Sequence, residues 1–148
     1  MSYRTLLIIS TLLIIGCSSE PQQKTKTVSK PKVKIKVPTF NADSAYAFVA
    51  KQVSFGPRVI SSKGWKNCAI WLEKKFKTYT STVIVQQAPI TTYDGKNHTL
   101  KNIIASFSPE KNNRVVLFAH WDSRHIADHD TENKNEPILG ANDGGSGV

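Results

Sequence analysis

The sequence predicts an α/β domain in which a mixed β-sheet is flanked by helices. Three observations predict it: helical periodicity over residues 41–76, two later segments joined by a tight-turn dipeptide, and a continuous apolar run at 114–119. With 148 residues, of which 39% are hydrophobic and 21% charged, the composition is that of a globular protein with one domain of ordinary size. Helices followed by strands indicate helices layered on a sheet.

Two helices are expected first. Asn41–Asp43 offers amino-terminal caps, and apolar residues then recur at helical spacing as far as Phe55–Pro57, where glycine and proline end the helix. Ser61 and Ser62 cap a second helix. Its apolar stripe is expected to form core rather than to bind a cofactor, and consists of Trp65, Cys68, Ala69, Leu72 and Phe76.

Three strands follow the helices. Thr82–Val85 is β-branched, and Asp94-Gly95 is the dipeptide typical of a tight turn leading to a second strand at Leu100–Phe107. Residues 114–119 are apolar after the first position, without alternation, and such a run is typical of a strand covered on both faces.

The formal net charge of +9 is unevenly distributed along the chain. Between Lys24 and Lys36 there are six lysines and no acid, so most of the excess belongs to one short segment. No helical or aromatic-interleaved basic face follows it, as nucleic-acid binding would need. We therefore expect no nucleic-acid partner. A solvated spacer is the favoured interpretation, and contact of its lysines with anionic lipid headgroups is the alternative.

The amino terminus predicts export. Arg4 precedes the apolar run Leu6–Ile15, which is shorter than the ~20 residues that a membrane-spanning helix needs. Residues 1–16 are therefore interpreted as a signal peptide. Ile14–Cys17 resembles the bacterial lipobox, in which the cysteine is acylated and becomes the mature amino terminus. An ordinary signal peptide with an incidental cysteine is the alternative.

This interpretation divides the chain into three parts. A signal peptide at 1–16 is followed at 17–38 by the lipidated Cys17 and a disordered basic tether, and the domain begins at residue 39. We expect an exported protein anchored by lipid to a bacterial membrane, on its periplasmic or outer face. The second cysteine, Cys68, is expected to be a buried, inert thiol.

A histidine and an aspartate directly follow the third predicted strand, as His120 and Asp122. Ligands of open α/β sheets gather at the carboxyl ends of strands, and residues two apart in a strand point to the same side. The two side chains can therefore act on one centre, with the carboxylate holding one imidazole nitrogen while the other faces a metal. In isolation, a strand-end histidine without a ligand is the favoured interpretation.

A glycine-rich segment, Gly140–Val148, comes some 20 residues later with Asp143 in it. Its glycines indicate a loop whose backbone approaches another group closely and presents Asp143 to a cleft. A flexible polar turn is the alternative, and a phosphate cradle is disfavoured because the P-loop lysine is missing. Four acids between the two motifs are expected to be solvated: Asp128, Asp130, Glu132 and Glu136.

Taken together, these motifs resemble the family of zinc aminopeptidases and glutaminyl cyclases. The matching residues are Asn102–Ala105, Ala119–Arg124 and Gly140–Val148, in the family's order and spacing. The resemblance covers residues 40 to 148 and implies a zinc-exopeptidase-like (phosphorylase/hydrolase-like) α/β fold. Phe55–Arg58 and the Trp-Asp-Ser-Arg form of the histidine motif are more similar to the cyclase branch.

The resemblance also implies roles for individual residues. Asp143 would be a zinc ligand, bridging two ions in the aminopeptidases and holding one ion in many cyclases. His120 would bind the second zinc of a two-zinc enzyme, with Asp122 supporting it from behind. The catalytic residues stay unknown: a catalytic glutamate and further ligands, including a late histidine, are expected beyond Val148, so we expect the chain to be the amino-terminal part of such an enzyme and to be inactive alone.

Three functions are open on this basis. The first is a glutaminyl-peptide cyclotransferase that uses zinc to convert amino-terminal glutamine to pyroglutamate. The second is a two-zinc aminopeptidase, and both would act on the amino termini of peptides or proteins. The third is a lipoprotein that binds partners without catalysis.

Overall fold

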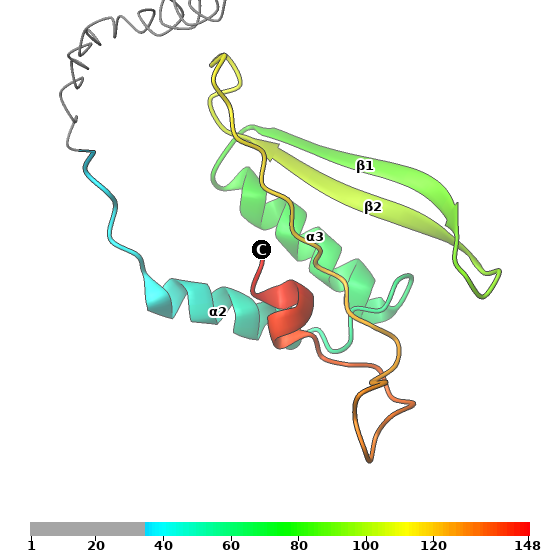
Figure 1. Cartoon of the computed structure of the whole chain (residues 1–148). Helices are drawn as coiled ribbons and strands as arrows, with labels where there is room; N and C mark the ends of the chain where they lie inside the picture. The colour runs from blue at the N-terminus through cyan, green and yellow to red at the C-terminus, as the bar shows by residue number, and fades with distance from the viewer. Residues whose placement is uncertain (1–34) are drawn as a thin grey trace, which may run out of the picture. The chain divides into compact units, whose positions relative to one another are not determined.

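The computed structural model describes residues 35–148. The predicted signal peptide, Cys17 and most of the predicted tether lie outside the described residues. Thr39–Val148 forms one compact unit, with the element order α2 (Ala42–Val53), α3 (Lys63–Lys77), β1 (Thr82–Thr91), β2 (Asn97–Ser106) and η1 (Ala141–Gly145) (Figure 1). Between residues 35 and 148, no helix has the length and apolar content needed to cross a bilayer.

Helix α2 begins and ends where the sequence predicts. The Asn41 side chain caps it by accepting a hydrogen bond from the Ser44 amide at 2.9 Å. After Val53 the chain turns away through Gly56, which has a φ of +79°. The buried residue of this helix is Gln52 rather than one of the predicted apolar residues, which are partly exposed. A buried polar side chain at this point indicates a specific partner, described below.

Helix α3 supplies the core of the unit. The Ser62 hydroxyl accepts a hydrogen bond from the Trp65 amide at 3.1 Å, which satisfies one free donor of the first turn. The predicted stripe is confirmed as core at Trp65, Cys68, Ala69 and Leu72, all buried, whereas Phe76 is partly exposed.

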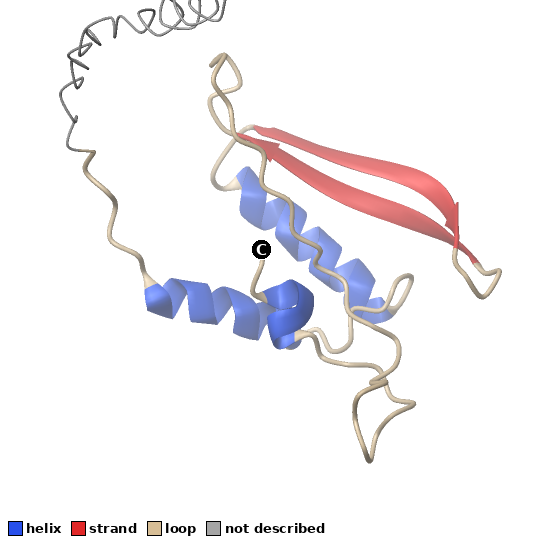
Figure 2. Cartoon of the chain, viewed as in Figure 1, coloured by secondary structure: helices blue, strands red, loops and turns tan. Residues whose placement is uncertain are grey.

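The strands β1 and β2 form a two-stranded antiparallel sheet with Thr82 opposite Ser106 and Thr91 opposite Asn97. Both are longer than the sequence predicted. The predicted turn is confirmed, with Gly95 at a φ of +76°. Helix α3 packs against both strands, and this helix-on-sheet layering confirms the predicted α/β class (Figure 2).

The strand predicted at residues 114–119 is not formed. The segment carries no strand pairing, and Val115, Leu117 and Phe118 have exposed fractions of 86%, 89% and 92%. An extended segment becomes a strand only when a neighbour completes its ladder of hydrogen bonds, and among residues 35–148 no segment lies in that position. The prediction of a strand covered on both faces was therefore wrong for the described chain.

Candidate active site

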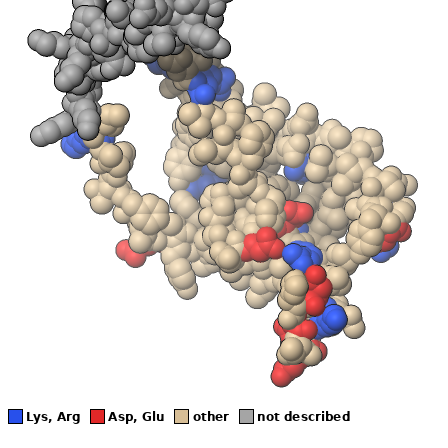
Figure 3. All heavy atoms as spheres, viewed as in Figure 1, with Lys and Arg blue, Asp and Glu red and all other residues tan. Residues whose placement is uncertain are grey.

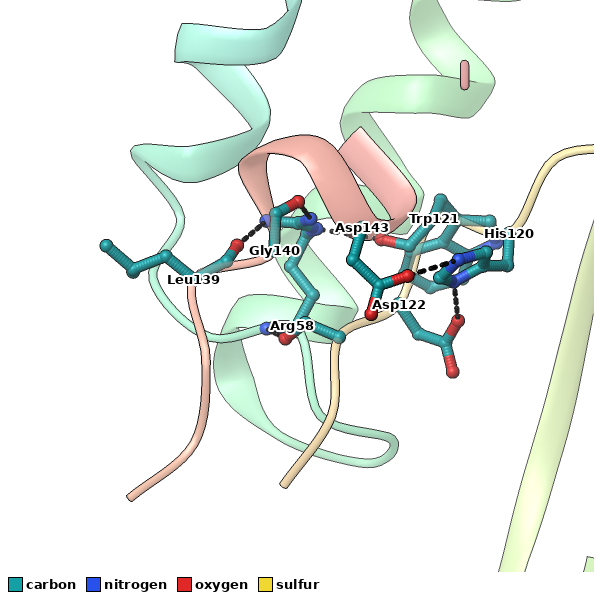
Figure 4. A network of polar contacts seen from close by, with 8 residues as sticks. Arg58, His120, Trp121, Asp122, Leu139, Gly140 and Asp143 are labelled. Carbon is teal, nitrogen blue, oxygen red and sulfur yellow. Dashed lines mark hydrogen bonds and ion pairs between the residues drawn. The ribbon is translucent and has the colours of Figure 1, made fainter. Parts of the chain in front are cut away.

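His120 lies between two carboxylates. Its Nδ1 is 3.1 Å from Asp122 Oδ1, and its Nε2 is 3.0 Å from Asp143 Oδ1 (Figure 4). The structure therefore brings together the three side chains that the sequence singled out from two motifs more than 20 residues apart. All three are at least half exposed. They can exchange protons or metal ions with solvent.

The contact between His120 and Asp122 has a direct chemical consequence. When Nδ1 carries the imidazole proton, it donates to the Asp122 carboxylate, and the lone pair of Nε2 then faces Asp143. A carboxylate behind a histidine is a common arrangement at metal sites, because it fixes the ring and its tautomer. The same-side placement expected for residues two apart is seen here, although this segment pairs with no strand in the described part of the chain.

The glycine-rich loop is shaped to approach this histidine. A Cβ atom built on Gly144 would lie 2.5 Å from the carbonyl oxygen of Asp122 and 3.1 Å from Cε1 of His120, and the residue has a φ of +95°. Only glycine fits such a position without a shift of the backbone. The close approach predicted from the glycines is therefore present, and the group approached is the segment that carries His120.

The backbone of η1 breaks its helical conformation at Asp143 itself, with φ −80° and ψ 100°. Gly140, before η1, adopts a left-handed conformation with φ +61°, and a Cβ there would lie 2.6 Å from the carbonyl oxygen of Asp143. The loop thus bends tightly on itself, and the Asp143 carboxylate points toward the His120 ring (Figure 4).

Two buried polar residues behind the loop were missed by sequence reasoning. Arg58 is fully buried and Gln52 is 1% exposed. Gln52 Nε2 donates to the carbonyl oxygen of Gly145 at 2.9 Å, and Arg58 donates to the carbonyl oxygens of both site segments. The only sequence signal was the position of Arg58 in the Phe-Gly-Pro-Arg motif, which did not reveal its burial.

A cavity of about 340 Å³ opens beside His120. Its lining includes residues of β2, residues 118–122 and Trp65 of α3. The rings of Trp65 and Trp121 stack with centroids 5.2 Å apart, and Lys101 Nζ lies 5.5 Å from the Trp65 ring centroid. The size is that of a small-molecule site.

The four acids predicted to be solvated are exposed, which confirms that prediction. They lie in a polar connection between the two motifs, where Figure 3 shows acidic and basic side chains interspersed. Asp128 pairs with Arg124 at 2.5 Å, and this hydrogen bond lowers the pKa of the Asp128 carboxyl. Asp130 accepts hydrogen bonds from two backbone amides, which lower its pKa.

The donor pair formed by His120 and Asp143 fits zinc. Two ligands of a tetrahedral zinc ion lie about 3.3 Å apart when each bond is about 2.0 Å long, and the observed separation of the two donor atoms is 3.0 Å. Imidazole nitrogen and carboxylate oxygen are both zinc ligands. Within residues 35–148 no group of three or more histidine, cysteine, aspartate or glutamate side chains is placed to hold a metal. The described residues therefore supply part of a ligand set.

Comparison with known proteins bears directly on this geometry. Residues 102–148 match the model of peptidase family M28. The matched stretch contains the second half of β2 together with His120, Asp122 and Asp143. Comparison with curated proteins gave no match.

Three solved structures are similar to the chain. A glutaminyl cyclase from Tannerella forsythia is 52% identical, with a TM-score of 0.72, over 74% of this chain and 38% of that one. A zinc-dependent exopeptidase from Parabacteroides distasonis is 51% identical, with a TM-score of 0.72, over 76% and 39%. A leucine aminopeptidase precursor from Bacteroides thetaiotaomicron is 47% identical, with a TM-score of 0.73, over 76% and 40%.

The chain spans about two fifths of the length of each of these structures. The predicted family resemblance and the predicted zinc-exopeptidase-like fold are both confirmed. Residues 102–148 match the model of peptidase family M28, and the fold of the chain is similar to part of a glutaminyl cyclase and of a zinc-dependent exopeptidase.

Proposed function

We propose that the complete gene product is a glutaminyl-peptide cyclotransferase, which converts the amino-terminal glutamine of peptides or proteins to pyroglutamate. The observation that carries the proposal is the contact of His120 with Asp143 at 3.0 Å, made inside the residues that match family M28. Similarity to glutaminyl cyclases from three genera, at 52%, 47% and 43% identity, favours this reaction over other chemistry of the fold.

The reaction requires no redox partner. The α-amine of the substrate attacks the side-chain carbonyl carbon of its own glutamine, the new C–N bond closes a five-membered ring, and the bond to the side-chain nitrogen breaks. One proton moves from the attacking amine to the leaving nitrogen, which departs as ammonia. Zinc bound at this site would supply Lewis acidity that polarises the side-chain amide.

The residues of this chain have defined parts in the proposal. Asp143 would hold zinc, and Asp122 would fix the His120 ring so that Nε2 stays directed at Asp143. The cavity beside His120, with its stacked tryptophans, offers an apolar surface for the substrate chain. The proton transfer needs a group whose pKa allows it to accept a proton from the attacking amine. None of the described residues is proposed for this role.

A two-zinc aminopeptidase is the second candidate. It is favoured by the leucine aminopeptidase precursor among the similar structures and by the direction of His120 Nε2, which faces Asp143 as a ligand of a neighbouring ion would. In that enzyme Asp143 would bridge two ions and His120 would be a ligand.

One experiment separates these functions. The complete gene product is purified, its zinc content per chain is measured, and it is assayed for cyclisation of a glutaminyl peptide and for cleavage of an aminoacyl amide. One zinc with cyclisation supports the cyclotransferase, and two zincs with amide cleavage support the aminopeptidase. Absence of zinc and of both activities would leave the non-catalytic lipoprotein as the function.

The cellular location is a separate proposal, which rests on the lipobox-like sequence before Cys17. The proposal is a lipoprotein exported from a bacterial cytoplasm and held to a membrane by its acylated cysteine, with the domain acting on peptides outside. Metabolic labelling with a fatty acid tests it. Label is expected in the wild type and not in Cys17→Ser, and label in both would contradict the assignment.

A further inference from the structure

The guanidinium group of Arg58 is buried, and no carboxylate among residues 35–148 pairs with it. The residue has no exposed surface, and no ion pair of its side chain exists among the described residues. Burying a charge is costly unless hydrogen bonds and dipoles compensate for the lost water. The acceptors of the Arg58 hydrogen bonds therefore compensate its charge, and they identify the segments that this residue connects.

Four hydrogen bonds from the guanidinium go to backbone carbonyl oxygens of three separate segments. Nε donates to Trp121 at 2.7 Å, and Nη2 donates to Gly140 at 2.7 Å (Figure 4). Nη1 donates to Leu139 at 2.8 Å and to Gln52 at 3.3 Å. The carbonyl dipoles compensate the charge, and four of the five N–H donors of the group are used.

The segments held in this way are the two that carry the site. Trp121 stands between His120 and Asp122, and Gly140 lies three residues before Asp143. We infer that Arg58 is the positioning residue of this site: its planar fork fixes the distance between the His120 segment and the Asp143 loop. The inference rests on the proposed function, because it takes His120 and Asp143 to lie at a metal site.

Backbone contacts strengthen the same connection. The Arg58 amide donates to Ser123 Oγ at 2.8 Å, and the Ser123 amide donates back to the Arg58 carbonyl oxygen at 3.1 Å. On the other side of the loop, Gln52 holds the carbonyl oxygen of Gly145, whose amide donates to Gly140 at 3.0 Å. The loop is therefore fixed at both of its ends, with Arg58 as the link to the His120 segment.

Lysine cannot reproduce this link. Its ammonium is a single point with three donors, whereas the guanidinium presents donors in a rigid plane that reach Trp121 and Gly140 at once. In Arg58→Lys one of the two segments loses its anchor. The separation of His120 and Asp143 should then change, and supporting contacts of metal ligands are typically worth 10–100-fold in metal affinity.

The test compares Arg58→Lys and Arg58→Met with Leu72→Ala in the complete gene product. Leu72 is 3% exposed in α3, makes none of the hydrogen bonds from Gln52 and Arg58 that hold the loop, and its truncation lowers stability. The zinc dissociation constant and the visible spectrum of the cobalt-substituted protein are measured at a temperature where all variants are folded. We expect both arginine variants to bind zinc about 10–100-fold more weakly and to shift the cobalt bands, while Leu72→Ala changes neither.

Wild-type affinity and wild-type cobalt bands in the arginine variants would overturn the inference. Failure of both variants to fold would also overturn it, because Arg58 would then serve global stability. The outcome for the proposed function is separate: a wild type that binds zinc without cyclising peptides refutes the cyclotransferase and leaves this test intact. If the wild type binds no metal, hydrogen exchange of the Ser123 and Gly145 amides is measured instead, with exchange at least tenfold faster expected in Arg58→Lys than in Leu72→Ala.

Discussion

The backbone of Gly144 lies directly against the imidazole ring of His120. A Cβ atom at Gly144 would stand 3.1 Å from Cε1 and 3.2 Å from Nδ1 of that ring, and 2.5 Å from the carbonyl oxygen of Asp122. The glycine thus lets the loop with Asp143 approach the His120 segment closely enough for the Asp143 carboxylate to contact the imidazole at 3.0 Å.

We therefore expect Gly144→Ala to displace the loop. Both the positive φ and the clash with a backbone oxygen oppose the methyl group, and the expected loss in the free energy of unfolding is about 2–4 kcal/mol. Zinc affinity should fall by at least tenfold, as measured by competition with a chromogenic chelator. Gly95→Ala is the matched control, because Gly95 also has a positive φ but no atom within 4 Å of its Cβ position. Equal effects of the two variants would contradict the close approach as the cause.

His120→Ala separates a one-zinc from a two-zinc site. In the proposed one-zinc enzyme we expect the zinc content to stay at one per chain, with kcat/KM lowered about 10–100-fold because Asp143 loses the imidazole beside it. In a two-zinc enzyme the content would fall by one ion. The measurement is zinc per chain by atomic emission together with steady-state kinetics, with His129→Ala as the control, since the side chain of His129 is 94% exposed. Loss of all zinc in His120→Ala would contradict the one-zinc site, in which His120 is not a ligand.

Local signals in the sequence predicted most of the elements correctly. Caps at Asn41 and Ser62 and the glycine of the β1–β2 turn act through neighbours a few residues away, so the sequence alone contains them. The same holds for the pair of His120 and Asp122, where a two-residue spacing decides which side chains meet.

Features that depend on distant segments were the ones that the sequence could not predict. Residues 114–119 have the composition of a covered strand, but a strand exists only with a neighbour, which residues 35–148 do not supply. Arg58 was missed because an arginine between loops is usually exposed, and its burial depends on carbonyl groups up to 82 residues away. Long-range hydrogen bonds leave no local pattern.

The exposed apolar segment predicts self-association of residues 39–148 when they are produced alone. Val115, Leu117 and Phe118 expose apolar side chains on a backbone that pairs with no strand within residues 35–148, which is the pattern that promotes edge-to-edge pairing. We expect concentration-dependent oligomers in sedimentation velocity, reduced by Leu117→Lys. Tyr46→Lys is the control, since Tyr46 is 77% exposed on α2 and isolated from this segment in sequence. A monomer at all concentrations would refute the prediction.

Cys68 gives the protein a defined pH dependence. Burial in the core raises the pKa of its thiol from 9.0 to about 11, against a smaller lowering effect of the Arg58 charge. Between pH 9 and pH 11 the native thiol keeps a proton that the unfolded chain releases, so the free energy of unfolding should fall by about 2–3 kcal/mol across this window, whereas below pH 9 the group has no effect.

Comparison with Cys68→Ala isolates this contribution from the lysines and tyrosines that titrate in the same range. The variant should be less stable than the wild type at neutral pH, because loss of the buried sulfur leaves a small cavity in the core formed by α3. Its stability should then fall less steeply above pH 9, so that the difference between the two proteins narrows as the pH approaches 11. Urea unfolding at a series of pH values measures this difference, and curves that stay parallel would mean that the native thiol ionises as readily as the unfolded one.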